Sequence, residues 1–168
     1  MKKTISICLT FLISFLIGCS GSSGFPSDVS CEDIADAVLN VTEHPEAEEY
    51  YTLSKGNLDS YSMSLWSDGL FEESSEFSKL DDYAIFLSAG TTTYEVAVLK
   101  AKNSDDVSLF TQLIERRKET LALGDKGMYD PNFKKRMDSS KVITEGNIVI
   151  FIVNDDITAA EDAINALK

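Results

Sequence analysis

The sequence predicts an α+β fold: an antiparallel four-stranded sheet from two ββα units, with the helices packed on one face, plus an N-terminal helix. Two observations support it. Apolar segments separated by short turns indicate one hairpin over residues 83–101 and another over 141–153. Each hairpin precedes an Asn/Asp-rich segment, 103–106 or 154–156, and then apolar residues at helical spacing. The hairpin–helix unit therefore occurs twice within one domain, residues 30–168.

The N-terminal helix begins with Ser30 as its N-cap, followed by Glu32 and Asp33 in the first turn. Its apolar residues recur on one face: Ile34, Ala35, Val38 and Val41. The helix is expected to end at His44, because a residue before proline avoids the α region.

Residues 46–80 carry a weak pattern. Asn57 to Leu65 fits a short helix, although Tyr61 to Leu65 also alternates as a strand would. The aromatic residues of this stretch that could line a groove include Tyr50, Tyr51, Trp66, Phe71 and Phe77. We expect most of them in the core, and any exposed ones are candidate interface anchors.

The pattern is clearer in the first ββα unit. Strands are expected at Tyr83–Ser88 and Thr93–Ala101, joined by a turn containing Gly90. A long helix follows and ends at Gly124. Its inner face is expected to carry Val107, Phe110, Leu113, Ile114 and Leu121.

The second unit is preceded by a short helix that begins at Asp130-Pro131 and carries Phe133 and Met137. Strands are then expected at 141–144 and 148–153. The last strand is apolar without interruption, which is typical of a strand covered on both faces or central in its sheet. The closing helix is expected to bury Ile157, Ala160, Ile164 and Leu167.

The N-terminus is typical of an export signal. Two lysines precede an apolar segment, residues 5–16, and Gly18-Cys19 follows shortly after it. That segment is shorter than the roughly 20 residues that cross a bilayer. The spacing Leu16-x-Gly18-Cys19 resembles a bacterial lipobox, with cleavage before Cys19 and a diacylglyceryl group on its sulfur. The sequence thus predicts a signal peptide (1–18), a lipidated cysteine with a flexible tether (19–29), and attachment to the extracytoplasmic face of the cell membrane. Free secretion after cleavage remains the alternative.

Charge is distributed unevenly along the chain. The net charge is −13, which argues against nucleic acid as a partner. Residues 28–95 hold sixteen acidic residues against two lysines, whereas residues 116–136 are net positive. A candidate anion- or partner-binding patch comprises Arg116, Arg117, Lys134, Lys135 and Arg136. The alternative is a set of solvated cations near helix C-termini.

Catalytic and metal chemistry receive little support. After signal cleavage, Cys31 has no disulfide partner, and about 20 Å of helix separates it from His44, the only histidine. We expect Cys31 to be a small buried residue. No zinc motif or calcium loop is present, and no cofactor is expected. The recurrent acid pairs leave weak calcium binding and a carboxylate-based hydrolase open.

Four motifs carry a family resemblance: the strand Glu95–Ala101, the pair Arg116-Arg117, Tyr129-x-Pro131 and Gly146-x-x-Val149. Together they resemble a small lipoprotein family of Gram-positive anaerobes, domain of unknown function 4358, over about residues 30–168. The resemblance implies a surface-anchored extracytoplasmic domain and brings no assigned catalytic residues.

The expected function is therefore a membrane-anchored, non-catalytic binding or interaction module of the cell envelope, whose partner is an envelope protein or ligand. An accessory subunit of a membrane transporter or of an envelope-assembly complex is the first alternative. An envelope hydrolase that uses carboxylates is the second.

Overall fold

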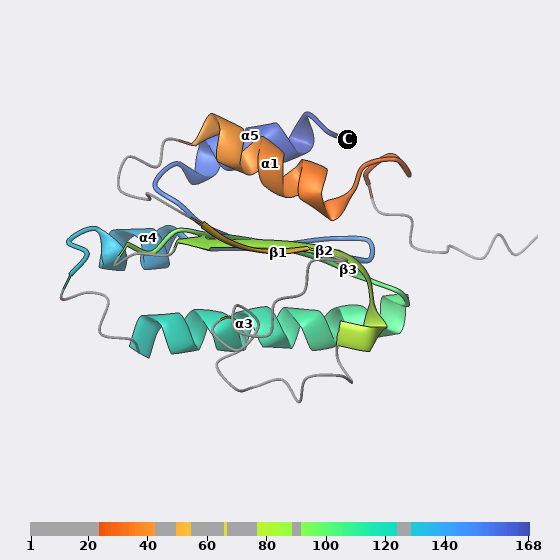
Figure 1. Ribbon diagram of the computed structural model, residues 1–168, viewed down its shortest axis with the longest axis horizontal. Coiled ribbons are helices and arrows are strands. Elements are labelled where there is room, and N and C mark those ends of the chain that lie inside the picture. The colour runs from red at the N-terminus through yellow and green to blue at the C-terminus, as the bar shows by residue number, and fades with distance from the viewer. Residues whose placement is uncertain (1–23, 43–49, 55–65, 67–76, 89–91, 124–128) are drawn as a thin grey trace, which may run out of the picture.

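The computed structural model describes residues 24–42, 50–54, 66, 77–88, 92–123 and 129–168. A five-stranded sheet lies between two layers of helices (Figure 1). The strands are β1 (Tyr50–Ser54), β2 (Leu80–Ser88), β3 (Glu95–Ala101), β4 (Lys141–Glu145) and β5 (Ile148–Val153). The α-helices are α1 (Cys31–Val41), α3 (Val107–Leu123), α4 (Phe133–Ser139) and α5 (Ile157–Asn165), with short 3₁₀ turns η1 (Phe77–Lys79) and η2 (Ser104–Asp106).

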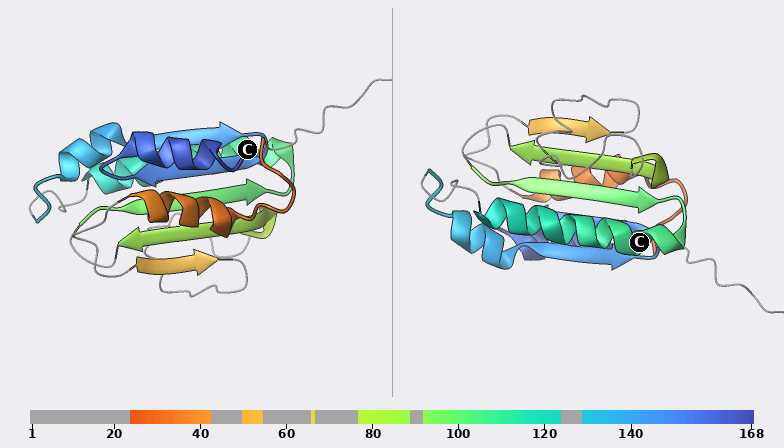
Figure 2. Two further views of the ribbon diagram at one scale, coloured as in Figure 1. Left: turned by 90° about the horizontal axis from the view of Figure 1, so that it is seen from above. Right: turned by 90° about the horizontal axis from the view of Figure 1, so that it is seen from below.

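All neighbouring strands pair antiparallel in the order β1-β2-β3-β5-β4, as Figure 2 shows from both sides. The two hairpins meet along β3 and β5, where Glu95 is opposite Val153 and Lys100 is opposite Ile148. This pairing places the two most apolar strands at the centre, where both faces can be covered. The β4–β5 turn depends on Gly146, whose φ of 58° lies in the left-handed region that favours glycine.

One face of the sheet packs on α3. On this face, β5 contributes Val149, Phe151 and Val153. They share one core with Phe110 and Ile114 of α3. Trp66 and two residues of α4, Phe133 and Met137, complete this core.

The other face packs on α1 and α5, which lie side by side (Figures 1 and 2). It receives Ile148, Ile150 and Ile152 from β5, together with Ile34 and Ile164 from the two helices. Every residue of β5 is therefore buried, and successive side chains enter opposite cores.

The start of α1 is fixed by side-chain caps. Ser30 and Asp33 form a capping box, in which the Ser30 hydroxyl accepts from the Asp33 amide at 3.1 Å. Hydrogen bonds from Ser30 lower the pKa of the Asp33 carboxyl. Asp82 of β2 accepts a further hydrogen bond from the Cys31 amide at 2.8 Å, which joins the helix start to the sheet.

The predicted α+β class and antiparallel sheet are confirmed, and the four predicted strands are present. Two details of the predicted architecture were wrong. The helices of the two ββα units lie on opposite faces, not on one, and β1 adds a fifth strand from the weakly patterned stretch. The expected short helix at 57–65 lies outside the described residues.

The physical reason for the two helical layers is visible in the central strands. A single layer would leave Val96, Val98 and three isoleucines of β5 exposed on the other face. Instead α5 joins α1 there, and each fully buried aliphatic side chain contributes about 1.5–3 kcal/mol. The uninterrupted apolar pattern of residues 148–153 predicts a strand covered on both faces or central in its sheet, and β5 is buried on both faces and lies between β3 and β4.

One residue of the predicted tether 19–29 packs on the domain. Phe25, expected in the flexible tether, is only 5% exposed and packs in the α1–α5 core. The ammonium of Lys168 lies 5.7 Å from the centre of its ring.

Candidate functional site

A buried ion pair joins β3 to α3. Arg117 donates to Glu95 through Nε at 3.1 Å and through Nη2 at 2.8 Å, and both side chains are almost fully buried. The indole Nε1 of Trp66 donates to the same carboxylate at 2.7 Å. Glu95 is thus bound from two sides, which compensates for the loss of water around its charge.

A second buried cluster centres on Arg136 of α4, which has no exposed surface. Its guanidinium forms an ion pair with Asp130 and donates to Asp155 at 3.2 Å. It also stacks 4.2 Å from the centre of the Tyr94 ring, and the Tyr94 hydroxyl donates to Asp155 at 2.6 Å. The cluster thereby connects α4 to the start of β3 and to the segment that leads into α5.

Asp130 holds this cluster to the backbone. Its carboxylate accepts from the amides of Thr93 and Asn132 at 3.1 and 3.0 Å. Burial acts to lower the pKa of Arg136, but its hydrogen bond to Asp130 and the nearby Tyr94 and Asp155 raise it above the usual value. Arg136 therefore remains a cation that organises one end of the sheet.

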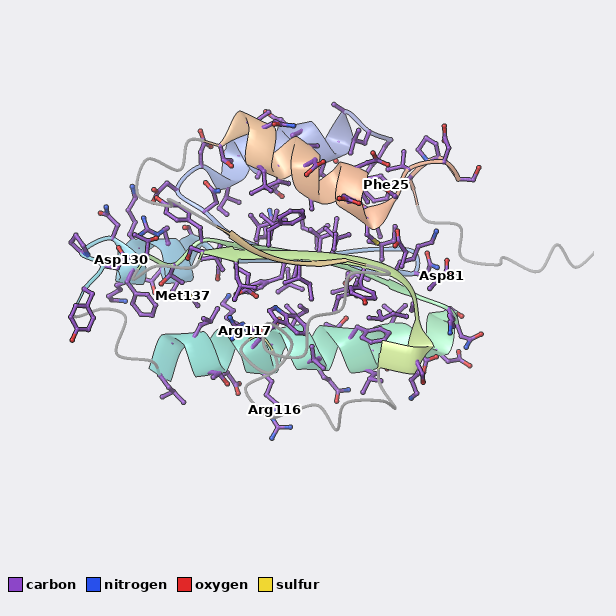
Figure 3. All side chains as sticks on the ribbon, in the orientation of Figure 1. Phe25, Asp81, Arg116, Arg117, Asp130 and Met137 are labelled. Carbon is purple, nitrogen blue, oxygen red and sulfur yellow. The ribbon has the colours of Figure 1, made fainter. Side chains whose placement is uncertain are left out.

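Two of the five residues predicted to form a basic patch belong to these buried clusters. Arg117 and Arg136 are interior, and their charges are compensated within the domain. Of the five predicted residues, Arg116, Lys134 and Lys135 lie at the surface. Figure 3 shows Arg117 directed toward the sheet and Arg116 directed away from it. The structure does not bring all five together as one surface.

The surface members divide between two helices. Arg116 lies on the outer face of α3, whereas Lys134 and Lys135 line a shallow depression on α4 with Pro131, Asp138 and Ser139. The Lys134 ammonium is already paired with Asp138 at 2.8 Å. Because this pair is exposed to solvent, it contributes little to stability.

The burial of Arg117 and Arg136 is indicated in the sequence by the positions of their apolar neighbours. Arg117 continues the buried stripe of α3 that contains Phe110, Ile114 and Leu121. Likewise, Arg136 lies between Phe133 and Met137 on the inner face of α4. Helical spacing alone therefore placed each arginine among buried residues.

Cys31 is not an accessible thiol. It is 1% exposed in the α1–α5 core, and burial together with the nearby Asp82 carboxylate raises its pKa far above that of an ordinary cysteine. The expectation that it is a small buried residue is confirmed. The predicted lipidation and cleavage residues, Cys19 and Gly18, and the histidine His44 lie outside the described residues.

The acidic residues of the described segments do not gather into a metal site: no group of three or more potential ligands occurs there. Several of them have structural roles instead. Asp156 caps α5 by accepting from the Ala159 amide at 2.9 Å, and its neighbour Asp155 belongs to the Arg136 cluster. Within the same segments, no helix combines the length and apolar character needed to cross a bilayer.

Comparison with known families agrees with the resemblance in the sequence. Residues 76–154 match the domain of unknown function DUF4358. The matched region runs from η1 through β5 and contains Glu95, Arg117, Asp130 and Arg136, but not their partners Trp66 and Asp155. It covers just under half of the chain and omits α1 and α5, so it is narrower than the expected 30–168. Comparison with curated proteins finds no match, and comparison with solved structures also finds none.

Proposed function

We propose that this chain is a lipid-anchored extracytoplasmic domain that serves as a non-catalytic binding module of the cell envelope. The observation that carries the proposal is the order of the N-terminal residues. Lysines precede a short apolar segment that ends at Leu16-Ile17-Gly18-Cys19. Cleavage before Cys19 and acylation of its sulfur would hold the folded domain at the outer face of the membrane.

The position of Phe25 supports a short linker. Because Phe25 is buried, only residues 20–24 separate Cys19 from the packed domain. A flexible chain of that length has an r.m.s. reach of about 12 Å. The domain would therefore be held close to the bilayer, and its linker would leave from the α1–α5 side, where Phe25 packs.

The α3 side is then the accessible side for a partner. Arg116 points outward from α3, and Lys135 is exposed on α4. Their positive charges stand out in a chain with a net charge of −13. We assign them to contact with an acidic partner face, since complementary charge increases the rate and specificity of association.

Membrane attachment is tested by expressing the chain and its Cys19→Ser variant with an alkyne-tagged fatty acid, followed by fractionation. We expect the wild type to be labelled and to sediment with membranes, while Cys19→Ser is unlabelled and keeps its signal sequence. Cys31→Ser is the matched control and should be labelled like the wild type. Equal labelling of wild type and Cys19→Ser would refute the anchor.

Partner contact is tested separately by crosslinking on intact cells. The double charge reversal Arg116→Glu/Lys135→Glu is expected to lose the crosslinked partners that the wild type retains. Lys102→Glu, also exposed but in the segment between β3 and η2, serves as the control. An unchanged set of partners in the double variant would contradict the assignment of this surface.

A further inference from the structure

The strand β4 presents an open edge of the sheet. It is last in the order β1-β2-β3-β5-β4, and in the described part of the chain nothing pairs with its outer side. Its pairing with β5 contains no bulge, and Lys141 and Thr144 are exposed. An even, bulge-free edge of this kind is able to accept another strand.

The β4–β5 turn determines which backbone groups face outward. Glu145 is opposite Ile148 across a two-residue turn, so these residues form the first hydrogen-bonded pair. Because the pattern alternates, Ile143 and Lys141 also bond toward β5. Val142 and Thr144 therefore direct their N–H and C=O groups toward the open edge.

We propose that two copies of this chain pair antiparallel through β4, about a two-fold axis at Ile143. In this register Val142 of one copy is opposite Thr144 of the other, and the two Ile143 residues face each other. The outward N–H and C=O groups of both strands are then matched. A shift by one residue would place an outward-facing residue opposite an inward-facing one and remove these hydrogen bonds.

Charge complementarity selects the second copy as the occupant. The same register places Lys141 opposite Glu145 of the second copy at both ends of the pairing. Each of these side chains already has an opposite charge on its own copy: Lys141 pairs with Glu161, and Glu145 pairs with Lys168. Association would join them into a row of alternating charges. A parallel arrangement would place like charges together, which is destabilising.

This arrangement is compatible with an anchored chain. The two-fold axis of an edge-to-edge antiparallel pair runs perpendicular to the sheet, so equivalent layers of both copies lie on the same side. Phe25 packs on the α1–α5 side, and both linkers would therefore leave from one side of the dimer. The pairing itself does not depend on lipidation.

The first test is a symmetric disulfide in the full-length chain. Cα atoms of a non-hydrogen-bonded cross-strand pair lie about 4.5 Å apart, within the range that a disulfide spans. We expect Ile143→Cys to yield a reducible dimer under mild oxidation. Thr144→Cys is the matched control, because its two thiols would lie on opposite sides of the axis, more than about 7 Å apart between Cα atoms.

The second test blocks the edge. Thr144→Pro removes an outward N–H without removing a bond to β5, and proline is tolerated on edge strands. Adding Thr144→Pro to Ile143→Cys should abolish the crosslink, whereas adding Thr144→Val should preserve it. Circular dichroism checks that each variant is folded.

The mass of the wild-type protein in solution tests the dimer even if a variant fails to fold. Sedimentation of the full-length protein in density-matched detergent should give a polypeptide mass twice that of one chain, and the mass of one chain for Thr144→Pro. A monomeric wild type would overturn the proposal. A crosslink equally strong in Thr144→Cys, or unaffected by proline, would also overturn it.

Discussion

Arg116 and Arg117 are adjacent in sequence but occupy different environments. Arg117 is bound to Glu95 in the interior, whereas Arg116 points away from the sheet (Figure 3). Replacing one partner of a buried pair leaves the other charged and poorly solvated, which typically costs about 3–5 kcal/mol. We therefore expect Arg117→Met to lower the free energy of unfolding by that amount.

Urea denaturation followed by fluorescence measures this difference, because Trp66 is the only tryptophan and contacts Glu95 directly. Arg116→Met is the control and should change stability by less than about 0.5 kcal/mol. Adding Glu95→Met to Arg117→Met should recover much of the loss, since neither charge of this pair is then left buried without its partner. Equal effects of the two single arginine variants would show that the interior pair is unimportant.

Cys31 gives a second prediction for a single residue. Burial and the Asp82 carboxylate raise the pKa of its thiol, so the reactive thiolate is scarce in the folded protein even at pH 8.5. Alkylation by iodoacetamide, followed at the peptide level by mass spectrometry, should be slow without denaturant. It should become rapid above the urea transition. Rapid native alkylation of Cys31 would contradict its placement in the α1–α5 core.

At the scale of elements, the hairpins and helix starts could be predicted because their signals are local. Ser30 and Asp156 cap their helices as their positions indicate, and Gly146 forms the turn between two apolar strands. The choice of sheet face for each helix could not be predicted in this way. It depends on pairing between β3 and β5, which are about fifty residues apart in sequence and together expose two apolar faces.

Gly146 allows the turn to be tested directly. Its φ of 58° is strained for residues with a side chain, so Gly146→Ala should lower the free energy of unfolding by about 1 kcal/mol. Asparagine adopts this conformation more readily, and Gly146→Asn should cost less. Thermal unfolding of the two variants measures the difference. If alanine is tolerated better than asparagine, the turn has a different backbone conformation.

At the scale of the whole molecule, the fold could be predicted from the sequence better than the positions of the surface charges. The sequence predicts Arg117 and Arg136 in one basic patch because positive charge is concentrated in residues 116–136. Their buried partners Glu95 and Asp130 lie 22 and 6 residues away along the chain. Each arginine lies at helical spacing from apolar residues of its own helix, and this spacing was the one signal that it is buried. What remains on the surface is Arg116 on α3 and, separately, Lys134 and Lys135 on α4.

The proposed membrane anchor depends on how the N-terminus of the whole molecule is processed. Mass spectrometry of the N-terminal peptide from membrane-purified protein tests this most directly. We predict that the mature chain begins at Cys19 and carries a diacylglyceryl group on its sulfur. A mature chain that begins at another residue, or an unmodified Cys19 thiol, would contradict the proposed membrane anchor.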